Sequence, residues 1–378
     1  MARIIIAPDS FKESLASYLV AGAIAAGVKR VLPQADIIQL PMADGGEGLG
    51  ECLCHALGGS KQQAPVTDPL GRPLTAEWIS LDQETAVIEM AAASGLALVP
   101  REIRDPMQAT SYGTGELIRA ALDAGYRRII VGVGGSATSD GGIGMARALG
   151  VRFLDAAGNP LPTDVPALLD LHSIDLSALH PAIGSAEFTA ACDVTNPLCG
   201  SQGAAYIYAP QKGATPDQVV VLDAALARLA TVVNKELGID LASHPGAGGG
   251  GGMGYGLLTF TGASLVSGLD LVCELTRFDE LLAAGADLII TGEGQINEQS
   301  LYGKVPAGIA SRAKKYGIPV LAVVGSIALS SLTAAQQGIS GVISIAPGPI
   351  TLDDCMARTP ELLADAAERA LRMIYLNQ

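Results

Sequence analysis

Hydrophobic and polar positions follow an alternating strand and helix pattern at both ends of this chain. Near the N-terminus, apolar residues at 3–7 predict a strand, apolar positions at helical spacing between 15 and 32 predict a helix, and 36–40 predict a second strand. The last third continues this alternation, with strands expected at 287–291, 320–324 and 342–345 and helices at 305–316, 331–337 and 353–375. Such alternation favours a parallel sheet with helices on both faces.

The middle of the chain has a different pattern. Short apolar runs joined by tight turns, which favour antiparallel pairing, occur at 63–67, 74–81 and 85–90. Downstream, helices are expected at 110–124, 143–149 and 215–237, and strands at 128–131, 151–154, 187–192 and 205–208. We therefore predict an α/β protein with a doubly wound parallel-sheet domain built from residues 1–65 and 270–378. A mixed α/β domain at residues 66–269, which carries the glycine-rich loops, is inserted into it.

The amino-acid composition limits which binding partners and which cellular compartment are expected. The chain of 378 residues is 49% hydrophobic and 16% charged, which is typical of a globular protein with large cores. Its 38 acidic and 24 basic residues give a formal net charge of −14, so neither nucleic acid nor a membrane surface is an expected partner. The six cysteines form no C-x-x-C pair and the N-terminus shows no secretory signal, so a cytoplasmic location is expected. A homodimer stays open as the oligomeric state.

The densest glycine loop, 132–142, lies between a predicted strand and a predicted helix. Glycines let a ligand approach the backbone closely, and the amides at a helix start attract anions, so this loop suits a phosphate group. Ser136, Thr138 and Ser139 add hydroxyl donors, and Asp140 adds a carboxylate able to hold a metal ion or accept a proton. A second glycine run at 246–254 offers another close backbone approach. A tight turn between strand and helix is the alternative interpretation of the first loop.

Polar clusters follow several of the predicted strands. Ligands of open parallel sheets bind beyond the carboxyl ends of the strands, where most of these clusters would fall. The clusters comprise Asp9, Ser10 and Lys12; Asp44 and Glu47; the loop with Asp140; Asp193 and Asn196; and Glu293 with Lys304. Phosphoryl transfer requires this inventory, because the phosphates need cations, the metal needs carboxylates and the attacking hydroxyl needs a base. Taken alone, these residues also have structural interpretations: Asp9 and Ser10 as a helix cap, Glu47 as a first-turn acid, Asn196 as a turn former, and the two lysines as solvated side chains.

Two other functions are compatible with parts of this pattern. Gly132, Gly134 and Ala137 match the G-x-G-x-x-A dinucleotide fingerprint, and Asp155 lies near the expected position of a ribose-binding acid. That combination would suit a nicotinamide-dependent hydroxy-acid oxidoreductase. The glycines at 141–142 argue against it, because they lie where the first helical turns should already be established. A non-catalytic nucleotide or phosphate sensor would keep the glycine loops but would not need several loop carboxylates.

A series of longer motifs runs through the chain in a fixed order. They are 7–15 (APDSFKESL), 43–48 (ADGGEG), 89–96 (EMAAASGL), 134–138 (GGSAT), 191–198 (ACDVTNPL), 210–214 (PQKGA) and 291–294 (TGEG). Together they resemble the motifs of the bacterial glycerate kinases. The chain departs from that pattern at Gln295 and Asn297, in a segment where the family usually carries an Arg and an Asp.

The resemblance implies ATP-dependent phosphorylation of D-glycerate with Mg²⁺, usually to 2-phosphoglycerate in this family, and a flavodoxin-like (Rossmann-type) doubly wound domain. On this interpretation glycerate and ATP are the small-molecule partners. Asp193 is the expected general base, because it ends a strand and precedes a polar turn, and Lys12 is the expected catalytic cation. Substrate or phosphate binding is assigned to Asp9, Ser10, Gly134, Gly135, Ser136, Thr138, Asn196, Gly248 and Lys304. Metal binding is assigned to Asp44, Glu47, Asp140 and Glu293.

Overall fold

The computed structural model describes residues 2–46, 48–301 and 304–375, which divide into two units. Unit 1 is drawn from residues 1–44, 51–58 and 267–378, and unit 2 from residues 45–50 and 59–266. Each unit has its own sheet and its own hydrophobic core, so each is described by itself. Within the described ranges, no helix has the length and apolar character needed to cross a membrane.

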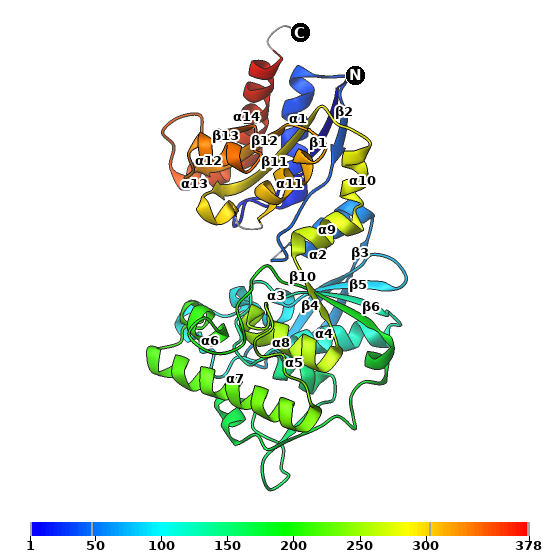
Figure 1. Cartoon of the computed structure of the whole chain (residues 1–378), viewed down its shortest axis with the longest axis vertical. Coiled ribbons are helices and arrows are strands. Elements are labelled where there is room, and N and C mark those ends of the chain that lie inside the picture. The colour runs from blue at the N-terminus through cyan, green and yellow to red at the C-terminus, as the bar shows by residue number, and fades with distance from the viewer. Residues whose placement is uncertain (1, 47, 302–303, 376–378) are drawn as a thin grey trace. The chain divides into compact units, whose positions relative to one another are not determined.

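Unit 1 is built on a parallel sheet of five strands in the order β13-β12-β11-β1-β2. The strands are β1 (Arg3–Ile6), β2 (Asp36–Gln39), β11 (Leu288–Ile296), β12 (Val320–Ile327) and β13 (Gly341–Ser344). Counted along the chain, this order is 2-1-3-4-5, the doubly wound flavodoxin-like arrangement. Figure 1 shows the two N-terminal strands, in blue, beside the strands from the last third of the chain. The predicted parallel sheet is therefore confirmed.

The helices that lie wholly or mostly in unit 1 differ in how much apolar surface they bury. They are α1 (Ser17–Val31), α2 (Leu49–Leu57), α9 (Gly268–Leu275), α10 (Phe278–Ala283), α11 (Val305–Lys314), α12 (Ser331–Gln336), α13 (Leu352–Ala357) and α14 (Thr359–Ile374). Gly27 lets α1 approach α14 closely, because a Cβ atom at this position would lie 2.2 Å from the carbonyl oxygen of Ala364. Burial of apolar surface between these two helices and the sheet is the main force holding both chain ends in one unit.

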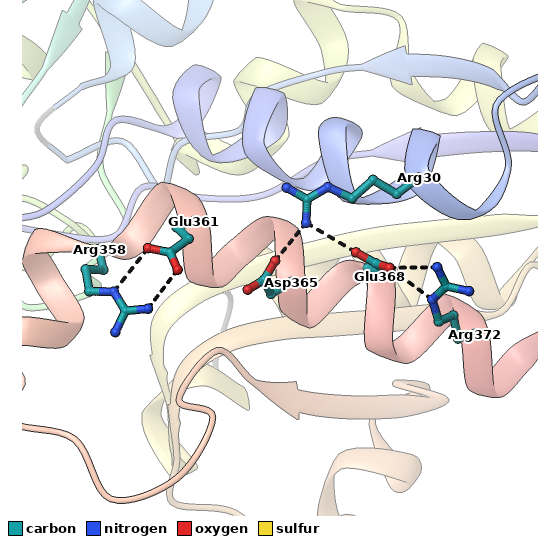
Figure 2. A network of polar contacts seen from close by, with 6 residues as sticks. All are labelled: Arg30, Arg358, Glu361, Asp365, Glu368 and Arg372. Atoms are coloured by element: carbon teal, nitrogen blue, oxygen red, sulfur yellow. Dashed lines mark hydrogen bonds and ion pairs between the residues drawn. The ribbon is translucent and has the colours of Figure 1, made fainter.

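A chain of ion pairs also joins α1 to α14 (Figure 2). Arg30 on α1 donates to Asp365 at 2.7 Å and to Glu368 at 3.2 Å, and Glu368 also accepts from Arg372. Because solvent screens these exposed charges, the network adds little to the stability of the fold. Its main effect is to favour the pairing of α1 with α14.

The single helix expected at 353–375 is wrong, because two helices occupy this segment. Helix α13 ends at Ala357, and α14 begins at Thr359 with Pro360 in its first turn. Proline has no amide hydrogen with which to continue an upstream helix, whereas it is well tolerated in a first turn.

Unit 2 contains a sheet of six strands in the order β10-β9-β6-β5-β4-β3. The strands are β3 (Ser60–Thr67), β4 (Pro73–Ser80), β5 (Thr85–Glu89), β6 (Arg128–Gly132), β9 (Glu187–Ala191) and β10 (Ser264–Val266). The pairings from β5 to β10 are parallel, and β3, β4 and β5 pair antiparallel. Strands β7 (Arg152–Leu154) and β8 (Ser173–Asp175) form a separate antiparallel ribbon. This mixed sheet confirms the expected inserted α/β architecture.

The helices of unit 2 are α3 (Ala91–Ser94), α4 (Tyr112–Asp123), α5 (Ile143–Ala148), α6 (Ala204–Tyr208), α7 (Pro216–Leu237) and α8 (Gly249–Thr261). Helix α7 starts as expected, with Thr215 and Gln218 forming a capping box and Pro216 in the first turn. The strand expected at 205–208 is wrong, because this run is helix α6. A short apolar run does not distinguish a strand from a buried helical turn.

Short 3₁₀ turns complete both units. They are η1 (Leu96–Leu98), η2 (Arg101–Ile103), η3 (Val165–Asp170), η4 (Pro181–Ser185) and η5 (Pro210–Lys212) in unit 2, and η6 (Glu298–Leu301) in unit 1.

Candidate functional site

Three acidic side chains of unit 1 meet at the carboxyl edge of its sheet. Asp9 follows β1, Asp44 follows β2, and Glu293 lies in the second half of β11. The backbone keeps these strand ends together, because the Asp9 amide donates to the Gly292 carbonyl at 2.8 Å. Strand order reverses between β1 and β11, and ligands of doubly wound sheets bind at such a switch point. The structure therefore brings these predicted residues to the expected edge.

Two lysines accompany the three acids. Lys12 Nζ lies 3.4 Å from Asp44 Oδ2, and Lys304 Nζ lies 3.8 Å from Glu293 Oε2. Lys304 caps the start of α11 as its N-cap residue, and the amide of Ser10 donates to Asp9 Oδ1 at 2.7 Å. Six of the predicted residues thus form one charged cluster within unit 1, named here the unit 1 cluster: Asp9, Ser10, Lys12, Asp44, Glu293 and Lys304.

Burial and nearby charges shift the pKa values of several residues in the unit 1 cluster. Asp9 is 4% exposed, and its burial, followed by the nearby charge of Asp44, raises its pKa to about 8. Burial also raises the pKa of Glu293. The pKa of Lys12 is raised, because attraction to Asp44 and Asp9 outweighs the opposite effect of burial. With a pKa of about 8, Asp9 is largely protonated at neutral pH, and a cation bound beside it would favour the ionised form.

The unit 1 cluster has the donor chemistry of a magnesium site. Oε1 of Glu293 is buried and has no hydrogen-bond partner among the described residues. Buried polar atoms are usually paired, so this oxygen could bind a metal ion. No group of three or more His, Cys, Asp or Glu side chains within the described part of the chain forms a complete metal cage. Mg²⁺ does not require one, since it usually takes one or two carboxylates and completes its shell with water and substrate phosphates. Glu47, the remaining predicted ligand near this edge, lies outside the described residues.

Unit 2 has its own carboxyl edge, formed by β5, β6 and β9. Glu89 ends β5 and accepts a hydrogen bond from the Gly48 amide at 2.6 Å. The loop 134–136 follows β6, and Asp193 lies exposed beyond β9. Since these three strands are parallel neighbours, the three features lie along one edge of the sheet.

The glycines of this edge are required by close backbone packing. A Cβ atom on Gly134 would lie 2.5 Å from Cα of Gly46, and one on Gly248 would lie 2.3 Å from the carbonyl oxygen of Pro197. Residues 250–252 all have positive φ, so only glycine fits there without strain. In the loop 134–136, Gly134 is half-buried, Gly135 is exposed and Ser136 is buried, which leaves the two glycines as the accessible part of the glycine loop.

Asp140 does not reach a surface where it would meet a metal ion. It is 1% exposed, and both its oxygens accept hydrogen bonds, from Ser111, Gly142 and Gly144. These bonds tie the start of α4 to the start of α5. The arrangement explains Asp140 as a structural acid, and it is left out of the metal ligands proposed below.

Asn196 and Thr138 are also committed to the local structure. The Asn196 side chain donates to the Gln202 carbonyl at 2.8 Å and accepts from the Tyr208 hydroxyl at 2.6 Å. Thr138 is fully buried, and its hydroxyl has no hydrogen-bond partner among the described residues. Its carbonyl oxygen accepts a hydrogen bond from Lys212 Nζ at 2.6 Å.

Lys212 is a buried charged residue that the sequence pattern did not single out. It ends η5, is 2% exposed, and also donates to the Ser136 hydroxyl at 2.8 Å. Burial lowers its pKa to about 7. The only sequence signal for it is its place in the motif PQKGA, because a single lysine in a turn is otherwise expected in solvent.

Asp155 does not form part of a dinucleotide site. It follows β7, which pairs antiparallel with β8 instead of joining β6 in a parallel sheet. Its side chain accepts from the amides of Ala157 and Asn159, as in an ordinary turn. Asp155 therefore does not end a strand that pairs parallel with β6, which is the position that the oxidoreductase alternative requires.

Gln295 and Asn297, which lie in a segment where the chain departs from the motifs it resembles, contact each other. The Asn297 amide donates to Gln295 Oε1 at 3.3 Å, near the end of β11. These neutral side chains leave Lys304 as the cation closest to Glu293 among the described residues.

Comparison with known proteins gives one consistent family. The sequence model described as "Glycerate kinase family" matches residues 4–375. A glycerate kinase of Halalkalibacterium halodurans is 47% identical over 97% of this chain and 97% of its own length. A glycerate 2-kinase of Escherichia coli (strain K12) is 48% identical over 93% of this chain and 92% of its own length. Among solved structures, a candidate glycerate kinase 2 from Salmonella typhimurium LT2 matches with a TM-score of 0.89 and 44% identity, over 100% of this chain and 99% of that one.

Proposed function

This chain belongs to the glycerate kinase family, and we propose on that basis that it transfers the γ-phosphoryl group of ATP to D-glycerate. The product we propose is 2-phosphoglycerate, because a similar chain is named a glycerate 2-kinase. The observation that carries the proposal beyond family membership is the unit 1 cluster. Three acids and two lysines at a sheet switch point suit a nucleotide phosphate group with its metal ion.

In unit 1, the lysines and the acids have separate tasks. Lys12 and Lys304 neutralise phosphate charge, as ammonium groups do in other phosphoryl transfer enzymes. Asp44 and Glu293 are the residues that would hold Mg²⁺, which, when bound, would neutralise charge developing on the phosphate oxygens. Asp9 and Ser10 line the same edge beside them.

In unit 2, the edge residues act on the acceptor. Asp193, which is exposed beyond β9, accepts the proton of the glycerate 2-hydroxyl. The freed oxygen then forms its bond to the γ-phosphorus while the bond from that phosphorus to the β–γ bridging oxygen breaks, releasing ADP. The loop 134–136 faces the same edge and binds an anionic group of a substrate.

The test is an ADP-release assay with a panel of three-carbon hydroxy acids, each measured with and without Mg²⁺. We expect turnover with D-glycerate that depends on Mg²⁺, and a ³¹P spectrum of the product showing phosphate on the 2-oxygen. No ADP release with D-glycerate at any Mg²⁺ concentration would contradict the function. A spectrum showing phosphate on the 3-oxygen would correct only the product.

A further inference from the structure

Lys212 is a buried cation whose hydrogen bonds go to the glycine loop of unit 2. Its Nζ atom donates to Ser136 Oγ at 2.8 Å and to the Thr138 carbonyl at 2.6 Å, and the residue is 2% exposed. Both hydrogen-bond acceptors are neutral, and the nearby charge of Asp140 offsets only part of the free energy that burying an ammonium group costs. A merely structural position would therefore be served better by methionine or leucine, so the charge calls for a functional explanation.

The surrounding backbone makes room for this charge. Gly251 has φ +72°, and a Cβ atom there would lie 1.9 Å from the Thr138 carbonyl oxygen and 2.9 Å from Lys212 Nζ. Glycine at this position thus lets the lysine head group pack directly beneath the loop. The second glycine run supports the first through this contact.

The hydrogen bond to Ser136 has a chemical consequence. A hydroxyl group has one hydrogen to donate and two lone pairs with which to accept. Because Ser136 Oγ accepts from Lys212, its own hydrogen remains to be donated elsewhere. Ser136 is itself 8% exposed, and it directly follows Gly135, the exposed residue of the loop. A cation behind a hydroxyl makes that hydroxyl a stronger donor to a negative ligand.

We propose that Lys212 is the positioning residue of this loop, and that through the Ser136 hydroxyl it prepares residues 134–136 to bind an anionic group of a substrate. The inference rests on the proposed function, which supplies two oxyanions, the glycerate carboxylate and a phosphate of ATP. Both present the same chemistry to the loop, and the kinetics below distinguish them.

The test compares Lys212→Met and Ser136→Ala with the parent protein and with Lys235→Met. Lys235 is an exposed lysine on α7 paired with Glu236, so it is the matched control. We expect both loop variants to raise KM by at least tenfold for D-glycerate or for ATP but not for both, while the control stays within twofold. The substrate affected identifies the anion. Unchanged KM values for both substrates in both variants, with only a lower Tm, would overturn the inference.

A pH profile adds a readout that a structural role would not move. In the parent, kcat/KM for the affected substrate should fall as the pH rises through about 7, because Lys212 loses its charge. Asp140 is the charged side chain whose field acts on Lys212 in the described structure, and it is kept in every variant. Lys212→Met should lack this fall, and a profile identical to that of the parent would count against the inference.

Two further outcomes, a variant that does not fold and a parent protein without kinase activity, can be distinguished from failure of the inference. If Lys212→Met does not fold, Ser136→Ala decides, because it keeps the lysine and removes only one hydroxyl. If the parent releases no ADP with D-glycerate, the proposed function fails by itself. Calorimetric titration with inorganic phosphate and with D-glycerate then tests the loop. Affinity at least tenfold weaker in Ser136→Ala supports the inference, and equal affinity, or no binding to the parent, overturns it.

Discussion

Ser111 donates both its amide and its hydroxyl hydrogen to one oxygen of Asp140, each at 2.8 Å. The Ser111 hydroxyl oxygen in turn accepts from the Met145 amide at 2.9 Å. This pair joins the N-terminal ends of α4 and α5, because each end offers backbone amides that need an acceptor. One of the four acids assigned to metal binding from the sequence is thus fully used by the fold.

Asp140→Ala should therefore reduce stability and should leave the magnesium requirement of the remaining folded enzyme unchanged. Several buried donors lose their acceptor, so we expect the free energy of unfolding to fall by about 3 kcal/mol or more. Denaturant unfolding measures the loss. Asp217→Ala, which removes an exposed acid from the first turn of α7, is the control and should cost less than about 1 kcal/mol. Equal stability of the two variants would contradict this assignment.

Gly251→Ala should be far more damaging than Gly238→Ala. Both glycines have positive φ, so each substitution carries a similar backbone strain of about 1–2 kcal/mol. Only at Gly251 would the new Cβ atom meet neighbours, whereas nothing lies within 4 Å of one at Gly238. Thermal unfolding of both variants should show a much larger fall in Tm for Gly251→Ala. Similar Tm values for the two variants would show that the backbone at Gly251 and Thr138 moves apart at little cost to accommodate the new Cβ atom.

Asp193→Asn should lower kcat by about 100-fold or more, because a general base typically contributes that much. Asp155→Asn is the matched control and should keep kcat within twofold of the parent, since Asp155 only closes a turn. Steady-state ADP release at saturating substrate measures both. Turnover of Asp193→Asn within a few-fold of the parent would exclude it as the base.

Glu293→Gln should raise the Mg²⁺ concentration needed for half-maximal activity by about tenfold or more. The amide keeps the size of the side chain but removes the charge. In the parent, Oε1 of Glu293 has no hydrogen-bond partner in the described structure. Glu274→Gln, an exposed position on α9, serves as the control. The assay is ADP release against Mg²⁺ concentration, and an unchanged requirement in Glu293→Gln would remove this residue from the metal site.

Much of the unit 1 cluster was predictable because parallel strands place their carboxyl ends at one edge. Asp9 and Asp44 each follow an early strand, and Glu293 lies in a later one, so strand order alone brings them together. The glycine loop of unit 2 was located for the same reason. The role of Asp140 was not predictable, because its partner Ser111 lies 29 positions upstream and no sequence pattern in either segment indicates that the two residues are in contact.

By itself, the sequence determined the alternation of strands and helices, the doubly wound sheet and the family, because periodicity and motif order are local properties of the chain. Only the tertiary structure decided which charged groups are buried and against what. It placed Lys212 beneath Ser136 and Thr138 and committed Asp140 to helix ends. From the sequence, residues 132–142 suit a phosphate group or form a tight turn, whereas in the structure most of this loop is buried and only Gly134 and Gly135 are accessible. The physical reason is that desolvation and hydrogen-bond satisfaction depend on neighbours distant in sequence, which no local pattern records.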